Sequence, residues 1–305
     1  MINGILNIYK EKGYTSHDVV ARLRGIVGQK KIGHTGTLDP DAEGVLPVCL
    51  GRATKVCDML TDKDKTYETV LLLGKTTDTQ DISGKVLKEC GADMIKKTDK
   101  AQVVSCIEAF AGEYHQVPPM YSALKVNGRK LYELAREGKT VERKSRKVMI
   151  YDIRIKDICL PRVRMEVDCS KGTYIRTLCH DIGDKLGTGG CMESLLRTKV
   201  GRFGLSGSLK LDEAEEYIKK GQLSEILIPT DAVFSESSAA VVTDKWAPLA
   251  YNGNPIPQDG ITERAGDGEQ VRVYDGGGRF IGIYKYEKRR RQFRLEKMFL
   301  DREEL

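Results

Sequence analysis

The segment GHTGTLDPDAEG, residues 33–44, most constrains what this chain can fold into. Its glycines and its proline interrupt any helical or strand periodicity, so it is predicted to be a loop. It lies between a helical pattern that ends near Val27 and an apolar run, Val45–Leu50, that is typical of a buried strand. One histidine, three carboxylates and two threonines are concentrated in it. Polar loops held between rigid elements are common sites of chemistry, so we expect a functional site here.

Strand-like and helical patterns alternate irregularly along the chain, which favours an α+β fold with a mostly antiparallel, mixed sheet flanked by helices. Apolar or alternating runs predict strands at Gly4–Tyr9, Val45–Leu50, Lys65–Leu73, Lys85–Cys90, Val148–Leu160 and Arg162–Cys169. The fourth of these is expected to pair with the third, and Pro161 to join the last two in a hairpin. Patterns of period 3.6 predict a helix capped by Thr15 or Ser16, a helix that runs from a Thr98-Asp99 cap to Phe110, and helices at Arg52–Leu60, Lys130–Arg136, Thr173–Leu186 and Leu211–Lys220.

A domain boundary is predicted near Pro229. Beyond it, Pro and Gly clusters separate short strands such as Glu269–Tyr274 and Phe280–Tyr286, and an Asp-Gly-Gly-Gly turn at 275–278 joins these two. The length of 305 residues accommodates one large and one small domain. We therefore expect a large domain at 1–231 and a small β domain at 232–305.

The formal net charge of +6 is unevenly distributed. Residues 124–147 contain nine Lys or Arg against three Glu, whereas residues 232–305 carry twelve charges of each sign. Such a basic segment suits contact with a polyanion, although a solvated helix face has the same composition. The chain shows no apolar run long enough to span a membrane, no basic signal-peptide region and no C-x-x-C pair among its eight cysteines. These features predict a cytoplasmic protein that does not associate with membranes.

Two short motifs imitate ligand sites and fail on inspection. The run Asp39-x-Asp41-x-Glu43-Gly44 starts like a calcium-binding loop, but Leu50 stands where the bidentate glutamate is required. The run Gly74-Lys75-Thr76 ends like a P-loop whose first glycine is missing. No H-x-x-H or C-x-x-C spacing supports zinc. The sequence therefore predicts neither a metal site nor a nucleotide site.

Asp39 remains as a carboxylate in a rigid loop, with His34 five residues upstream. Tyr67 opens a predicted strand that can aim its phenol at the loop. A tight turn at Ser170–Thr173 leads into a helix that can direct Arg176 inward. An arginine beside Asp39 is expected to keep it ionised by lowering its pKa. From the residues alone, a catalytic site and a buried structural ion pair both fit this constellation.

The run from Gly33 to Pro40, continued by Ala42, Gly44 and Leu46-Pro47-Val48, resembles a signature of the TruB family of bacterial tRNA pseudouridine-55 synthases. Other stretches resemble segments of the family in the family's order, namely Lys65–Tyr67, Pro118–Lys125, Ser170–Arg176 and Leu195–Thr198 with Gly201 and Phe203. Together they span residues 4 to about 232. The remaining tail resembles the small RNA-binding PUA-type domain of this family less specifically.

The resemblance implies a pseudouridine synthase fold in which residues 1–231 form the catalytic domain, 118–147 a basic thumb and 232–305 a PUA-type domain. It implies isomerisation of uridine 55 in the T loop of tRNA, with no cofactor and no metal. Asp39 would be the catalytic carboxylate, and both attack on C1′ and removal of the C2′ proton remain open for it. Arg176 would hold Asp39, and Tyr67 would stack on the target base and assist proton removal at C5.

The expected partner is the T arm of tRNA, into whose loop His34 would insert after the target base has been flipped out. Other residues expected to contact RNA are Tyr67, Tyr174, Lys125, Lys130, Arg143, Lys144 and Arg146. No protein partner is implied, and a monomer is expected. A role in RNA folding beside catalysis, an RNA-binding module that does not catalyse, and a base-excising carboxylate enzyme remain alternatives.

Overall fold

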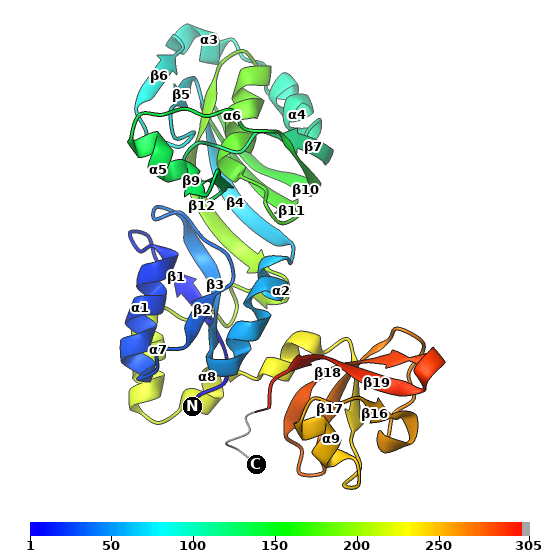
Figure 1. Cartoon of the computed structure of the whole chain (residues 1–305). Helices are drawn as coiled ribbons and strands as arrows, with labels where there is room; N and C mark the ends of the chain where they lie inside the picture. The colour runs from blue at the N-terminus through cyan, green and yellow to red at the C-terminus, as the bar shows by residue number, and fades with distance from the viewer. Residues whose placement is uncertain (301–305) are drawn as a thin grey trace.

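A ten-stranded sheet organises the computed structural model, which describes residues 1–300 (Figure 1). Eight strands follow the order β14-β1-β3-β12-β4-β11-β10-β7, while β2 pairs with β3 and β13 with β12. The strands are β1 (Gly4–Lys10), β2 (Ile32–His34), β3 (Glu43–Leu50), β4 (Lys65–Leu73), β7 (Gly112–Gln116), β10 (Arg146–Cys159), β11 (Arg162–Cys169), β12 (Gly190–Val200), β13 (Phe203–Gly204) and β14 (Leu227–Ile228). Every pairing described in this sheet is antiparallel except β3 with β12. The predicted α+β class with a mostly antiparallel, mixed sheet is confirmed.

The parallel contact between β3 and β12 joins two half-sheets. It is short, since only Glu43 and Gly44 pair there with Leu196 and Arg197. Gly44 has φ +106°, and a Cβ at this position would lie 2.2 Å from the Arg197 carbonyl oxygen. A side chain would therefore force the strands apart. The loop that carries Asp39 enters β3 at this junction, so the close approach of the two backbones positions the loop.

Helices cover each half-sheet separately (Figure 1). On the half that contains β1 and β3, a core cluster packs α1 (Ser16–Val27) and α7 (Leu211–Lys219) against the strands, and α8 (Leu223–Ile226) follows α7. Thr15, one of the two predicted caps, forms a capping box with Asp18 at the start of α1. On the half that contains β4 and β11, a second cluster packs α4 (Lys100–Glu108) and α6 (Ile175–Lys185).

Two of the predicted elements differ in the structure. The strand β6 (Val86–Glu89) pairs with β5 (Lys75–Thr77) in a separate two-stranded sheet, so the expected pairing of Lys85–Cys90 with β4 is wrong. The true neighbours of β4 are β11 and β12, and β12 was not predicted. The helix expected at Arg52–Leu60 begins as the 3₁₀ helix η1 (Gly51–Val56) and becomes α-helical only in α2 (Cys57–Thr61). A short helix, α3 (Ala92–Lys96), follows β6.

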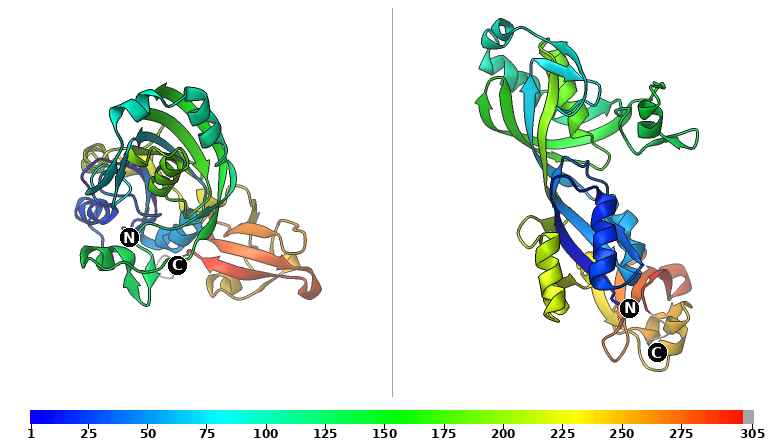
Figure 2. Two further views of the ribbon diagram at one scale, coloured as in Figure 1. Left: turned by 90° about the horizontal axis from the view of Figure 1, so that it is seen from above. Right: turned by 90° about the vertical axis from the view of Figure 1, so that its left-hand side faces the viewer.

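The basic excursion leaves the sheet after β7. Residues 117–121 contain no helix or strand, as the two prolines predict. The small hairpin β8 (Lys125–Val126) and β9 (Arg129–Lys130) then leads into α5 (Leu131–Arg136), which confirms the short predicted helix. In the right-hand view of Figure 2 the segment that carries α5 projects from the body of the molecule.

A second, β-rich unit follows the large sheet. Its five strands have the order β15-β17-β18-β19-β16, and β17 and β18 form the predicted hairpin. Its elements are η2 (Thr230–Phe234), β15 (Ser238–Val241), α9 (Ala247–Tyr251), β16 (Ile256–Pro257), η3 (Gln258–Gly260), β17 (Gln270–Tyr274), β18 (Phe280–Glu287), η4 (Lys288–Arg290) and β19 (Gln292–Met298). The predicted boundary at 231/232 falls inside η2.

One apolar cluster joins the two units. Phe234, Ile283 and Phe299 of the small unit pack with Val45 and Val56 of the large one. The small sheet therefore lies against the side of the molecule that carries η1 and α2 (Figure 1). Within residues 1–300, no helix has both the length and the apolar character needed to cross a membrane.

Candidate active site

The neighbours of Asp39 on both sides are fixed by hydrogen bonds. The Ser16 hydroxyl, at the start of α1, accepts a bond of 2.9 Å from the Leu38 N–H. The ammonium group of the fully buried Lys10 donates to the Pro40 carbonyl at 3.1 Å, and burial lowers the Lys10 pKa to about 8. The loop therefore presents Asp39 from a rigid support, as its composition predicts.

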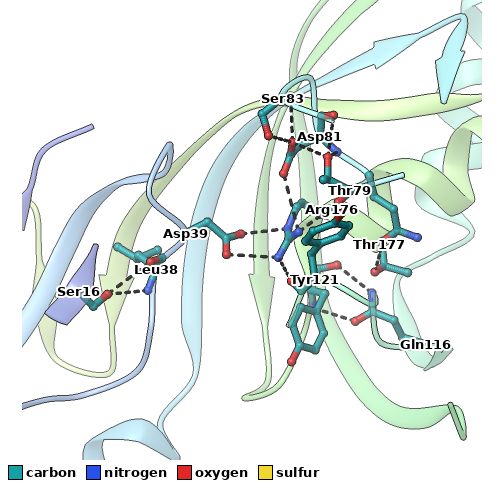
Figure 3. Close-up of polar contacts among 12 residues, drawn as sticks. Ser16, Leu38, Asp39, Thr79, Asp81, Ser83, Gln116, Tyr121, Arg176 and Thr177 are labelled. Carbon is teal, nitrogen blue, oxygen red and sulfur yellow. Dashed lines mark hydrogen bonds and ion pairs between the residues drawn. The ribbon is translucent and has the colours of Figure 1, made fainter. Parts of the chain in front are cut away.

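Arg176 meets Asp39 through a two-pronged contact (Figure 3). Its Nε lies 2.9 Å from Asp39 Oδ2, and its Nη2 donates to Asp39 Oδ1 at 3.2 Å. Arg176 is the second residue of α6, and its side chain is only 6% exposed. The planar guanidinium thus fixes both the position and the orientation of the carboxylate.

The remaining donors of Arg176 reach two other segments. Nη1 donates to the Thr79 carbonyl at 3.1 Å, and Nη2 donates to the Tyr121 carbonyl at 2.8 Å. A second carboxylate, that of Asp81, lies 3.8 Å from Nη1 on a different side of the guanidinium (Figure 3). Arg176 therefore connects the Asp39 loop, the turn after β5 and the base of the excursion.

The expected lowering of the Asp39 pKa is wrong in direction. The side chain is 39% exposed because one side opens to a cleft, while protein surrounds the remaining sides. This burial raises the pKa of Asp39 above its ordinary value, and the Arg176 charge only partly opposes the rise. The negative charge of Asp81 raises the Asp39 pKa further, by a smaller amount. The geometry of the predicted ion pair is present, but desolvation outweighs its attraction.

Tyr67 comes from β4 and lies in the core beneath the cleft. Burial raises the pKa of its hydroxyl, and the neighbouring Arg197 guanidinium acts in the opposite direction. Arg197 is 1% exposed and donates from Nε to the Val45 carbonyl at 2.8 Å. Tyr67 is therefore held in a fixed position, with its hydroxyl protonated at neutral pH.

Two clefts open on either side of Asp39 and Arg176. The first, which we call the tyrosine cleft, has a volume of about 570 Å³ and is lined by Tyr67 and Tyr174. Its basic lining residues are Lys65, Arg146, Lys147, Lys171, Arg176 and Arg197. The second, the thumb cleft, has a volume of about 680 Å³ and extends to Lys130 and Tyr132. A cleft of the first size accommodates a nucleotide, and its basic rim suits phosphate.

The structure brings some of the predicted RNA-contacting residues to these clefts. Tyr174 and Arg146 line the tyrosine cleft, and Lys130 lines the thumb cleft. His34 lines neither, but its ring makes an edge-on contact with His17 at 5.2 Å between centroids. Burial, with help from His17, lowers the pKa of His34, so its ring is neutral at pH 7.

Other predicted contacts lie away from the clefts. Lys125 and Lys144 are exposed on the excursion and line neither cleft. Arg143 is partly buried and donates to the Pro118 carbonyl at 3.1 Å, which ties the two ends of the excursion together. Contact of these three residues with RNA stays a prediction.

Reasoning from the sequence missed several residues around Asp39. Arg197, Asp81 and Lys10 each face the Asp39–Arg176 pair or its support, and none was named as a site residue. The available signal for Arg197 was its place directly after Leu195 and Leu196 in the stretch Leu195–Thr198 that resembles a family segment. Within the described part of the chain, no group of three His, Cys, Asp or Glu side chains is arranged to hold a metal ion.

Comparison with known proteins identifies the family. The N-terminal domain of TruB family pseudouridylate synthases matches residues 24–175, and the C-terminal domain of tRNA pseudouridylate synthase B matches residues 176–235. The tRNA pseudouridine synthase B of Lachnoclostridium phytofermentans is 51% identical over 98% of this chain and 100% of its own length. That of Clostridium tetani is 42% identical over the same shares. This chain belongs to the TruB family.

Solved structures agree with this TruB assignment. A chain in a Cbf5–Nop10–Gar1 complex is 27% identical, with a TM-score of 0.72 over 98% of this chain and 86% of that chain. A chain of an H/ACA RNP bound to a substrate RNA has a TM-score of 0.71 over the same shares, and at 24% identity it supports the fold alone. The predicted pseudouridine synthase fold is confirmed.

Because the Asp39 pKa is raised, we expect the free energy of unfolding of this TruB protein to depend on pH. The folded state binds the Asp39 proton more tightly than the unfolded chain does, so ionisation lowers the free energy of unfolding. The loss begins as pH rises past the ordinary carboxyl value of about 4 and is complete above the raised pKa. Asp39→Asn removes this titration. Its free energy of unfolding relative to wild type should therefore increase with pH through that window, as measured by urea unfolding. A relative decrease would show that Arg176 outweighs burial.

Proposed function

We propose that this protein converts uridine 55 in the T loop of tRNA to pseudouridine. The observation that carries the proposal is the bidentate contact between the buried Arg176 guanidinium and the Asp39 carboxylate, at the floor of a cleft that Tyr67 also lines. Membership of the TruB family supports tRNA as the substrate. The choice of position 55 and of the T arm rests on the resemblance of the loop at 33–44 to the family signature.

In the proposed reaction the C1′–N1 bond breaks, the uracil turns within the tyrosine cleft and a C1′–C5 bond forms. One proton leaves C5 and one is taken up at the former N1, so the product is an isomer. Asp39 acts as an ionised carboxylate, either on C1′ as a nucleophile or on the C2′ proton as a base. A raised pKa suits both roles because it makes the carboxylate a stronger base.

Tyr67 and Arg176 have separate tasks in this reaction. Arg176 keeps one orientation of the Asp39 carboxylate while the sugar changes position. Tyr67 stacks on the flipped base, which is worth about 1–3 kcal/mol. To accept the proton from C5, the Tyr67 hydroxyl must first lose its own proton. The neighbouring Arg197 guanidinium favours this loss because its charge stabilises the phenolate.

The RNA is held around the cleft. Flipping a stacked base costs a few kcal/mol, and the neutral ring of His34 is suited to fill the vacancy in the T loop. Residues 118–147 act as a thumb over the T arm, and residues 232–305 act as a PUA-type RNA-binding domain beside the catalytic domain 1–231. We further infer that the protein acts in the cytoplasm as a monomer without a protein partner.

Asp39→Asn should abolish pseudouridine formation and leave tRNA binding within about threefold of wild type, because the amide preserves shape and removes the reactive carboxylate. Pseudouridine mapping on unmodified tRNA, with the wild type and this variant, checks both the reaction and position 55. Residual activity within about tenfold of wild type would reject Asp39 as the catalytic group.

The same experiment separates the alternative functions. Release of free uracil in place of pseudouridine would show a base-excising enzyme. Wild-type protein that binds and refolds tRNA with no isomerisation would show an RNA-folding module. If isomerisation and refolding both occur and Asp39→Asn removes only the first, the protein has both roles.

Neutralising the thumb should weaken the binding of all tRNAs alike, because phosphate contacts carry no sequence information. Changing Lys130, Lys144 and Arg146 to Ala should flatten the slope of log affinity against log salt by roughly 0.7–0.9 for each phosphate that is no longer neutralised. The matched control changes Lys210, Lys219 and Lys220 around α7, which removes the same charge at a distance from both clefts. Equal slopes for the two triple variants would show that the thumb charges only face solvent.

A further inference from the structure

Gln116 is a buried polar residue that the proposed reaction does not yet use. It ends β7, the last strand at one edge of the large sheet, and is 1% exposed. Its side-chain oxygen accepts a hydrogen bond of 2.7 Å from the Tyr174 N–H, and its side-chain nitrogen donates to the Tyr174 carbonyl at 2.9 Å. Both polar atoms of this side chain therefore bind the backbone of a single residue, and the side chain also contacts the Tyr114 hydroxyl.

Tyr174 is the N-cap residue of α6, two positions before Arg176. The α6 N-terminus has no side-chain cap from Tyr174, and the Tyr174 carbonyl also accepts the first helical bond, from the Leu178 N–H at 3.1 Å. A helix start without a cap is free to fray. The Gln116 amide replaces the missing restraint, because it fixes both backbone groups of the residue from which the helix begins.

Gln116 is also the residue from which the thumb departs. Val117 and two prolines follow it, and prolines have no N–H with which to continue the strand. A few residues later the Tyr121 carbonyl accepts a bond from Arg176 Nη2. The chain from 116 to 121 is thus tied to the start of α6 at both ends, once by Gln116 and once by Arg176 (Figure 3).

We propose that Gln116 is a positioning residue that aims Arg176 at Asp39 and couples this aim to the base of the thumb. When bound RNA moves the thumb, the hydrogen bonds between Gln116 and Tyr174 and between Arg176 and Tyr121 transmit the displacement to the Arg176 side chain. The kinetic part of this inference rests on the proposed function. Gln116 itself touches neither Asp39 nor either cleft, so it acts only through Tyr174 and Arg176.

The chain contains a matched control for this role. Tyr114, two residues earlier on β7, donates its hydroxyl proton to Asp181, which lies further along α6. Tyr114→Phe removes the hydrogen bond to Asp181 and the contact of the Tyr114 hydroxyl with the Gln116 side chain but leaves both Gln116–Tyr174 bonds in place, whereas Gln116→Met removes that pair at the start of the helix. Both variants lose side-chain hydrogen bonds between the same two elements, so a general loss of stability affects them alike.

Single-turnover rates at saturating tRNA should separate the two variants. Gln116→Met should lower the rate by roughly tenfold to a hundredfold, because small misplacements of a catalytic group have effects of that size. Its tRNA affinity should stay within about threefold of wild type, and Tyr114→Phe should keep the wild-type rate. Gln116→Met combined with Arg176→Lys should be no slower than Arg176→Lys alone. A wild-type rate for Gln116→Met, or equal losses in both variants, would overturn the proposal.

Gln116→Glu gives a pH-dependent readout that a role in stability alone does not predict. A protonated carboxyl can accept from the Tyr174 N–H and donate to its carbonyl, as the amide does, whereas an ionised one repels that carbonyl. The rate of this variant relative to wild type should therefore rise as pH falls. A ratio of the two rates that does not change with pH would count against a positioning role for Gln116. If Gln116→Met does not fold, the comparison of Gln116→Glu at low and high pH takes its place.

One readout is independent of turnover. Looser placement of Arg176 weakens its attraction for Asp39, so the Asp39 pKa, followed by carboxyl-carbon NMR and assigned with Asp39→Asn, should rise further in Gln116→Met and not in Tyr114→Phe. An unchanged Asp39 pKa would overturn the proposal. Absence of pseudouridine from the wild-type reaction would reject the proposed function instead, and the titration would still decide the role of Gln116.

Discussion

The buried Arg176 side chain is the interaction on which the site depends. A guanidinium offers five N–H donors in a fixed plane, and here they reach Asp39, Thr79 and Tyr121 from one point at the start of α6. These partners belong to three segments that are distant in sequence. The site therefore exists only when the two half-sheets, the turn after β5 and the base of the thumb are assembled together. Any change that moves α6 also moves Asp39's partner.

The surroundings of Asp39 make its carboxylate more basic and lower the free energy of unfolding of the protein. Burial raises the Asp39 pKa and Arg176 recovers only part of the cost, so the folded protein holds a carboxylate that is more basic than one in water. The rest of the structure supports this arrangement by rigidity. Gly44 lets β3 approach Arg197 of β12, and Lys10 and Ser16 fix the backbone on either side of Asp39. Strain and desolvation at functional sites are commonly offset elsewhere in this way.

The sequence predicted what depends on local pattern and missed what depends on register. The loop around Asp39, the strand of Tyr67 and the turn before Arg176 each have local signals, and the structure brings them together as expected. The strand β12 was missed because polar residues such as Glu193 and Ser194 interrupt its pattern, while its pairing with β4 places Arg197 beside Tyr67. The Asp39 pKa was assigned the wrong direction because a sequence names a charged partner but does not show how much protein surrounds it.

The central claim is that the Arg176–Asp39 pair acts on a uridine flipped into the tyrosine cleft. The most direct test is a crystal structure of the protein with a T-arm hairpin that carries 5-fluorouridine at position 55, since fluorine at C5 replaces the proton that must leave. The account predicts the modified ring in the tyrosine cleft against Tyr67, its C1′ next to the Asp39 carboxylate, and Arg176 still bound to Asp39. A target base that stays stacked in the T loop, or a sugar that lies away from Asp39, would contradict it.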